Sequence, residues 1–199
     1  TQVFDFAATT AVGAVAVDWE SNIVYVGTGE VNSSRSSYAG TGIYRSSDHG
    51  AHWEHLGLEQ THHIGKIILH PKEPNTLWVA AAGPLYSKNT TGGIYKSTDG
   101  GAHWERMLGI DGTAGIDLVM DTENPNHLYA SLWQRSRSAW DFVEGGEDSG
   151  LYETTDGGKE WSDLTQLGGL PDRQHLGRMG MAHDALANVL YVRLDDQSP

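Results

Sequence analysis

The sequence predicts an all-β fold made of repeated blades of four antiparallel strands, which is a β-propeller arrangement. One short string of residues occurs three times, at spacings that suit one blade for each copy. Short runs of β-branched and aromatic residues, separated by turns, fill the intervals, and a helical period is almost absent. Twenty-five glycines against six prolines also indicate many tight turns.

The repeated string follows the pattern Ser/Thr-x-Asp-x-Gly-x-x-Trp, and its aspartates are separated by 51 and then 57 residues. The aspartate can accept hydrogen bonds from backbone N–H groups of its own turn, and the glycine can adopt a positive φ. The tryptophan can fill the apolar interior of the blade. We therefore predict a structural role for the following residues: Ser46, Asp48, Gly50 and Trp53; Ser97, Asp99, Gly101 and Trp104; Thr154, Asp156, Gly158 and Trp161.

Each unit begins with an alternating stretch, a turn and a second β-rich run, and continues with a glycine and an apolar–aromatic pair before the string. The expected elements, in order, are the last strand of a preceding blade in residues 1–11, with its strand near residues 3–6; blades in 12–58, 63–109 and 113–166; and the first strands of a further blade in 176–199. Such an arc leaves sheet edges open, so we expect the remaining propeller blades or another chain to cap them.

Composition excludes several classes of function. Twenty-six acidic and thirteen basic residues give a net charge of −13, which disfavours binding to nucleic acid and to anionic membrane surfaces. No apolar run is long enough to insert directly into a membrane, and no leader is visible at Thr1, so we expect a mature product or an excised piece. Because cysteine is absent, disulfides and thiolate sites are excluded.

Further strings, in residues 23–30, 63–67, 116–121, 128–135 and 176–180, accompany the three repeats. On these residues the chain resembles the Asp-box propellers, also called bacterial neuraminidase repeats, of the sortilin-like and glycosyl-hydrolase-like bacterial type. The resemblance covers nearly the whole chain and implies a propeller that either binds a ligand or hydrolyses glycosides. Two enzyme motifs are missing: residues 27–30 read Gly-Thr-Gly-Glu where xyloglucan hydrolases carry Arg-Thr-Asp, and the Arg-Ile-Pro of sialidases is absent.

The long loops between the second and third strands of each blade are expected to share one face with the connections between blades. They cover residues 27–40, 81–92 and 131–149, and function commonly lies in such loops on a rigid scaffold. Aromatic residues beside charged ones suit either a sugar ring or a peptide. Trp133 could equally pack between blades, whereas Trp140 is expected at the surface. The ligand-binding candidates are Tyr38, Tyr86, Trp133, Arg135, Arg137, Trp140, His62 and His63.

Glycoside hydrolysis requires two carboxyl groups about 5–10 Å apart. The catalytic candidates are Glu30, Asp141 and Glu144. No cofactor and no metal site is expected, because the spacing of His49, His52 and His55 would spread these side chains across a turn. Three functions remain open at this point: a module that binds a glycan or polypeptide, a glycoside hydrolase or a fragment of one, and a structural subunit of a larger assembly. The binding module is expected to be extracytoplasmic, that is secreted, periplasmic or on the cell surface.

Overall fold

The structure, a computed structural model, describes residue 4, residues 7–167 and residues 169–198. Most of the strand expected near residues 3–6 therefore lies outside the described residues. The strands are β1 (Val12–Asp18), β2 (Ile23–Thr28), β3 (Ile43–Ser46), β4 (Glu54–His55), β5 (Ile64–Leu69), β6 (Leu77–Ala81), β7 (Gly93–Ser97), β8 (Glu105–Leu108), β9 (Thr113–Met120), β10 (Leu128–Gln134), β11 (Ser136–Arg137), β12 (Phe142–Val143), β13 (Gly150–Thr154), β14 (Ser162–Asp163), β15 (Leu176–Asp184) and β16 (Val189–Asp196), with 3-10 turns η1 (Glu59–Thr61) and η2 (Arg173–His175).

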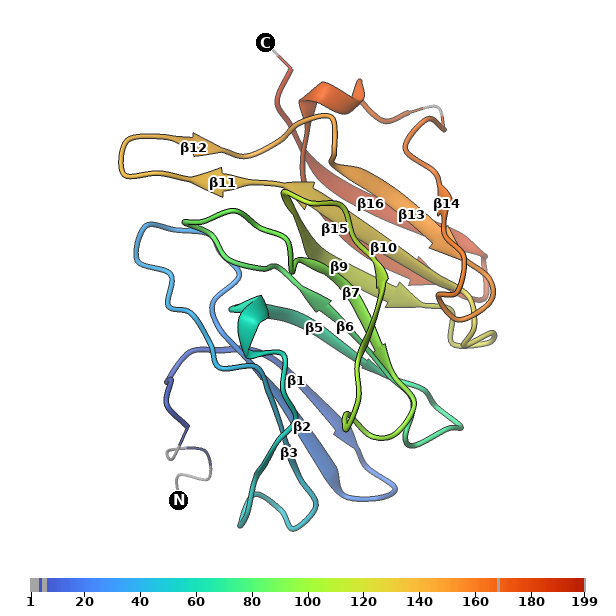
Figure 1. Cartoon of the computed structure of the whole chain (residues 1–199). Coiled ribbons are helices and arrows are strands. Elements are labelled where there is room, and N and C mark those ends of the chain that lie inside the picture. The colour runs from blue at the N-terminus through green and yellow to red at the C-terminus, as the bar shows by residue number, and fades with distance from the viewer. Residues whose placement is uncertain (1–3, 5–6, 168, 199) are drawn as a thin grey trace.

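The strands form three four-stranded antiparallel sheets, as the repeated string predicted (Figure 1). Blade 1 contains β1 to β4 and blade 2 contains β5 to β8, in sequence order. Blade 3 contains β9, β10, β13 and β14, and the pair β15–β16 forms a partial blade 4. The prediction of an all-β fold built from propeller blades is thus confirmed.

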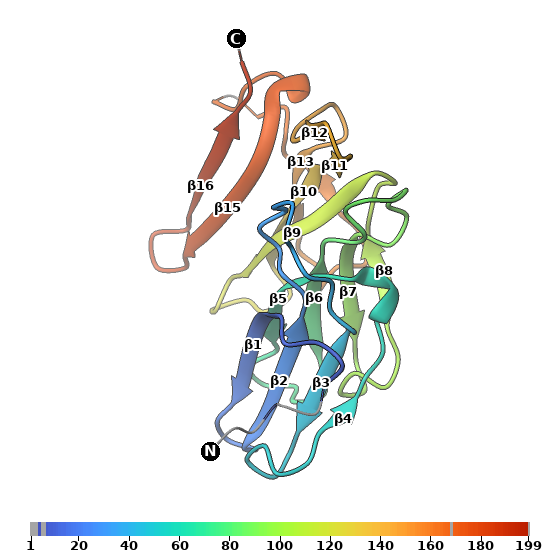
Figure 2. The same cartoon turned by 90° about the vertical axis from the view of Figure 1, so that its left-hand side faces the viewer.

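The blades form an open arc around their first strands. β1 contacts β5, β5 contacts β9, and β9 contacts β15. Blade 1 and partial blade 4 lie at opposite ends of the molecule in both views (Figures 1 and 2). Large apolar side chains are exposed at both ends: Val12 and Val15 on β1, and Val189 and Tyr191 on β16. The arc therefore has apolar surface at its two open ends.

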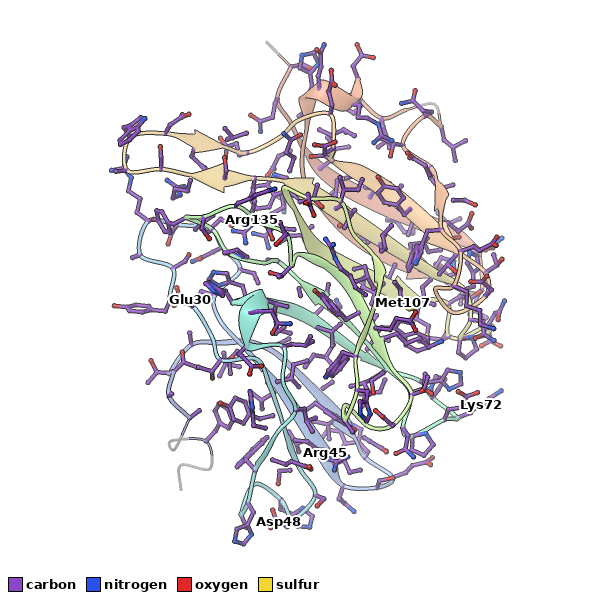
Figure 3. All side chains as sticks on the ribbon, viewed as in Figure 1. Glu30, Arg45, Asp48, Lys72, Met107 and Arg135 are labelled. Carbon is purple, nitrogen blue, oxygen red and sulfur yellow. The ribbon has the colours of Figure 1, made fainter. Side chains whose placement is uncertain are left out.

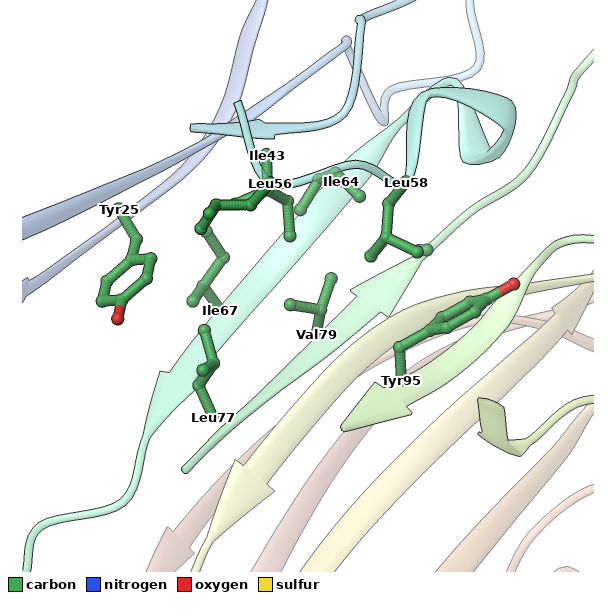
Figure 4. Close-up of a cluster of buried hydrophobic side chains, with 10 residues drawn as sticks. Tyr25, Ile43, Leu56, Leu58, Ile64, Ile67, Leu77, Val79 and Tyr95 are labelled. Atoms are coloured by element: carbon green, nitrogen blue, oxygen red, sulfur yellow. The ribbon is translucent and has the colours of Figure 1, made fainter. Parts of the chain in front are cut away.

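The core lies between neighbouring blades rather than in one central cluster. Blades 1 and 2 enclose a group that includes Tyr25, Ile43, Ile64 and Leu77, all at most 1% exposed (Figure 4). A second group lies between blades 2 and 3 and is centred on Trp78, which is fully buried. Burying one large apolar side chain contributes about 1.5–3 kcal/mol, so each interface between blades is a main source of stability.

Each repeated string forms the turn between the third and fourth strands. In blade 2 the hydroxyl of Ser97 donates to Asp99 and accepts the N–H of Gly101, both at 2.8 Å. Asp99 accepts the N–H of His103 at 2.9 Å and contacts its ring Nδ1 at 2.6 Å. Gly101 has a φ of 97°, which favours glycine. Equivalent bonds link the serine or threonine to the aspartate and glycine in the other two strings.

These turns also join the blades. The side chain of Arg45 on β3 donates to the carbonyl of Gly100 in the string of blade 2, at 3.3 Å. One blade further along, Lys96 on β7 donates to the carbonyl of Gly157 at 2.9 Å. The indole of Trp78 donates to the same oxygen at 3.1 Å. The string therefore fixes its own turn and also anchors the preceding blade.

Blade 3 departs from the simple repeat in the connection between its second and third strands. β10 continues to Gln134, and the chain then forms the short hairpin β11–β12. The sequence predicts a loop over residues 131–149, because no alternation of apolar residues marks the hairpin that the structure has there. The hairpin projects from the body of the arc (Figure 1).

Candidate functional site

The connections between second and third strands from all three blades meet on one face, here called the loop face. Arg135 and Arg137 of blade 3 donate to the side chain and the carbonyl of Ser33 in blade 1. The hydroxyl of Tyr86 in blade 2 donates to the carbonyl of Arg35 in blade 1, at 3.0 Å. Loops far apart in the sequence are thus tied together into one surface.

A cleft of about 500 Å³ opens on this face between the β6–β7 connection and the base of the β11–β12 hairpin. Its volume lies in the range of small-molecule and saccharide sites. We call it the loop-face cleft. Its lining residues are Leu85, Tyr86, Ser87, Lys88, Asn89, Asp111, Gly112, Gln134, Arg135, Ser136, Arg137 and Val143.

Arg135, near the base of the β11–β12 hairpin (Figure 3), lines the loop-face cleft and is only 2% exposed. Its Nη2 donates to the carbonyls of Ala82 and Gly83 at 3.2 and 3.1 Å. Its Nε is buried and has no partner among the described residues. Burial, and secondarily the charge of Arg178, lower the pKa of Arg135 to about 10, so the guanidinium stays charged at neutral pH.

Arg137 and Lys88 supply the other two cations of the cleft. Arg137 is placed by two contacts: its Nε donates to Ser33 and its guanidinium lies 3.8 Å from the ring centre of Phe142. Lys88 is exposed. Across the described residues, no ion pair involves either cation or Arg135. The one carboxylate in the lining is Asp111, so the cleft is locally positive in a protein of net charge −13.

Three of the sequence candidates are exposed aromatic residues. Trp140 lies in the turn that joins the two strands of the hairpin and is 86% exposed. Tyr38 is also exposed, and its backbone pairs with that of Glu30. Tyr86 is about half exposed and lines the cleft. His62 is partly buried after η1. The expectation that Trp140 lies at the surface agrees with its exposure.

Two other candidates, Trp133 and His63, are buried and do not line the cleft, so their role as ligand contacts stays a prediction. Trp133 is 4% exposed because its indole packs inward and donates to the carbonyl of Glu144 at 2.8 Å. His63 is 3% exposed, and its Nδ1 has no partner among the described residues. Burial, with a smaller effect from Arg135, lowers the pKa of His63 to about 4, so the ring is neutral at pH 7.

The catalytic candidates lie outside the loop-face cleft. Glu30 accepts the backbone N–H of Tyr38 at 3.2 Å within its own loop. Asp141 closes the tip of the hairpin: its carbonyl accepts the N–H of Ser138, and its own N–H donates to the hydroxyl of Ser138. Glu144 is exposed, and none of the three lines the cleft. The cleft therefore lacks the two facing carboxyl groups that glycoside hydrolysis requires.

Six polar residues that line the cleft were not among the sequence candidates: Ser87, Lys88, Asn89, Asp111, Gln134 and Ser136. Lys88 and Gln134 stood on loops already expected to carry function, and Asp111 lies in the connection between blades 2 and 3. The sequence signal for them was loop membership alone.

Within residues 4, 7–167 and 169–198, no three histidine or carboxylate side chains are grouped to hold a metal ion. The same residues contain no helix of the length and hydropathy needed to cross a membrane.

Comparison with known families matches residues 41–168 to the family described as Sortilin-Vps10, "Sortilin, neurotensin receptor 3". This match includes the three repeated strings and more than half of the chain. The chain belongs to the Sortilin-Vps10 family. No curated protein sequence matches this Sortilin-Vps10 chain significantly.

Solved structures share the fold at low sequence identity. An ancestral GH74 enzyme is 18% identical over 92% of this Sortilin-Vps10 chain, with a TM-score of 0.63. The GH74 xyloglucanase from Xanthomonas campestris is 17% identical over 92% of the chain, with a TM-score of 0.59. The GH74 enzyme from Niastella koreensis is 18% identical over 79% of the chain, with a TM-score of 0.55. The present chain spans only 22 to 28% of these proteins.

Proposed function

We propose that this chain is the ligand-binding part of an extracytoplasmic propeller, which holds a glycan or a polypeptide in the loop-face cleft. The observation that carries the proposal is the cleft of about 500 Å³ bounded by loops from different blades. Such a concave site, with a few polar groups on a rigid scaffold, is the usual form of a binding site.

The contacts between the loops support binding without large rearrangement. Tyr86 is held by its bond to the carbonyl of Arg35, and Arg137 by its contacts with Ser33 and Phe142. A site whose side chains are already fixed loses less entropy when a ligand binds. The family description also names a receptor, which favours binding over catalysis.

The proposal is tested with the intact protein on glycan and peptide arrays, followed by titration calorimetry of any ligand found. Tyr86→Ala should weaken binding about tenfold or more, because it removes a cleft wall. The matched control is Trp19→Ala, which removes another exposed aromatic residue, at the turn between β1 and β2. Equal affinity of Tyr86→Ala and the unaltered protein for every ligand would contradict the proposal.

Glycoside hydrolysis is the second candidate, favoured by the fold shared with GH74 enzymes. It predicts release of reducing sugar from xyloglucan, and loss of that activity in a variant of one candidate carboxylate such as Glu30→Gln. Our proposal of binding predicts no release above a buffer control. Turnover abolished by a single carboxylate substitution would establish the hydrolase instead.

The third candidate, a structural role in an assembly, is favoured by the exposed apolar residues at both ends of the arc, such as Val15 and Tyr191. We propose that further propeller blades or another chain cover these ends. Light scattering of the 199-residue chain alone should then show self-association. A stable monomer of 21.6 kDa would contradict this part of the proposal.

A further inference from the structure

The loop-face cleft has an uncompensated positive charge. Lys88, Arg135 and Arg137 line it, against one carboxylate, Asp111. The remainder of the protein has the opposite balance, since the net charge of the chain is −13. A concave cationic site on an acidic protein attracts a negatively charged group locally while the wider surface repels extended polyanions.

The surroundings of Arg135 also favour an anion at this site. Arg135 is only 2% exposed, yet its side chain makes hydrogen bonds only to neutral carbonyl and hydroxyl oxygens. Its Nε has no partner among the described residues. A buried charge is costly unless a counter-charge lies near it, and a buried N–H without a partner adds to that cost. A bound anion would offset the uncompensated charge.

We infer that the loop-face cleft recognises an acidic sugar, through the carboxylate of a uronic acid-type residue placed against Arg137 and Lys88. The inference rests on the proposed function and adds the chemical class of its ligand. Arg135 acts as a positioning residue: its charge favours the carboxylate, and its bonds to blades 1 and 2 hold the loops in place.

The other walls of the cleft favour a sugar over an acidic peptide. Tyr86 offers an aromatic surface whose hydroxyl is already bonded to Arg35, so the ring is fixed before a ligand binds. Sugar rings stack on such surfaces through their apolar faces. The side chains of Asp111 and Ser136 can bond hydroxyl groups. A short acidic peptide offers carboxylates without the ring and its hydroxyls.

The test uses the full protein and three probes in titration calorimetry: tetragalacturonate as acidic sugar, cellotetraose as neutral sugar and tetraglutamate as acidic peptide. We expect tetragalacturonate to bind at least tenfold more tightly than either other probe, with an affinity that falls as salt is raised. Lys88→Ala combined with Arg137→Ala should weaken this binding about tenfold or more, because two charged contacts are lost.

Lys72→Ala is the matched control, since Lys72 is also exposed but lies far from Arg135 in the turn between β5 and β6 (Figure 3). Arg137→Lys keeps the positive charge and should recover part of the affinity that Arg137→Ala loses. If the hairpin tolerates no change at Arg137, Lys88→Glu serves as the second variant. Preferential binding of tetraglutamate would overturn the choice of a sugar. Cellotetraose binding as tightly as tetragalacturonate would overturn the acidic class and leave the proposed function intact. Tetragalacturonate binding that the cation variants leave unchanged would also overturn the inference. If Tyr86→Ala weakens the binding of no ligand of any kind, the proposed function itself fails.

Discussion

Trp78 should be the side chain on which the contact between blades 2 and 3 depends most strongly. It is fully buried and packs in the cluster that contains Ile94 and Leu118, and its indole donates to Gly157 at 3.1 Å. Trp78→Ala removes the whole ring and should cost about 3–5 kcal/mol. Trp78→Phe keeps most of the packing and loses one hydrogen bond and some volume, so it should cost about 1–3 kcal/mol. The carbonyl of Gly157 keeps its bond from Lys96, which limits the cost of Trp78→Phe.

The assay is urea denaturation followed by circular dichroism, which does not depend on the tryptophan signal. A domain is typically stable by about 5–15 kcal/mol, so Trp78→Ala should remove a large part of the total. Trp19→Phe is the control, because Trp19 is 82% exposed and its replacement should change stability by less than about 0.5 kcal/mol. If Trp78→Phe costs as much as Trp78→Ala, or if neither differs from Trp19→Phe, the account of this interface is refuted.

Three further predictions concern buried groups. Ser97→Ala should cost about 1–3 kcal/mol in urea denaturation, because it leaves the N–H of Gly101 without its acceptor; an unchanged midpoint would contradict this. His63 has its pKa lowered to about 4 in the folded state, whereas the unfolded chain takes up the proton near pH 6.5. Stability is therefore full above pH 6.5 and falls between pH 6.5 and 4, by at most about 3 kcal/mol, and His63→Phe should flatten that part of the pH profile. Gly115→Ala would place its methyl group against the carbonyl of Gly93 in the neighbouring blade, so it should lower the melting temperature, and an unchanged value would count against the close approach of the blades.

The turn of each repeated string could be predicted from the sequence because its interactions are local. Ser97, Asp99 and Gly101 lie within five consecutive residues, and their hydrogen bonds close within the same turn. The run that becomes β16 is similarly readable, because its residues alternate between exposed and partly buried over most of the strand. These local rules were sufficient to predict the blades and their order.

The candidate site could be predicted only in part, because it depends on contacts between distant loops. The sequence placed Tyr86 and Arg137 on the loop face but could not show that Arg137 reaches Ser33, 104 residues away. Trp133 and Arg135 are two residues apart and both are buried, yet only Arg135 lines the cleft. The sequence could not show this difference, because the β11–β12 hairpin next to the cleft has no clear sequence pattern.

The central claim is that the loop face holds the ligand, and hydrogen exchange of the intact protein with and without a bound ligand tests it most directly. A ligand identified on the arrays should slow exchange in residues 83–89 and 134–143, which include the two walls of the loop-face cleft. The turns at residues 70–75 and 121–126, which join the first and second strands of blades 2 and 3, should exchange at unchanged rates. Protection confined to those turns, with none in the cleft walls, would contradict the account.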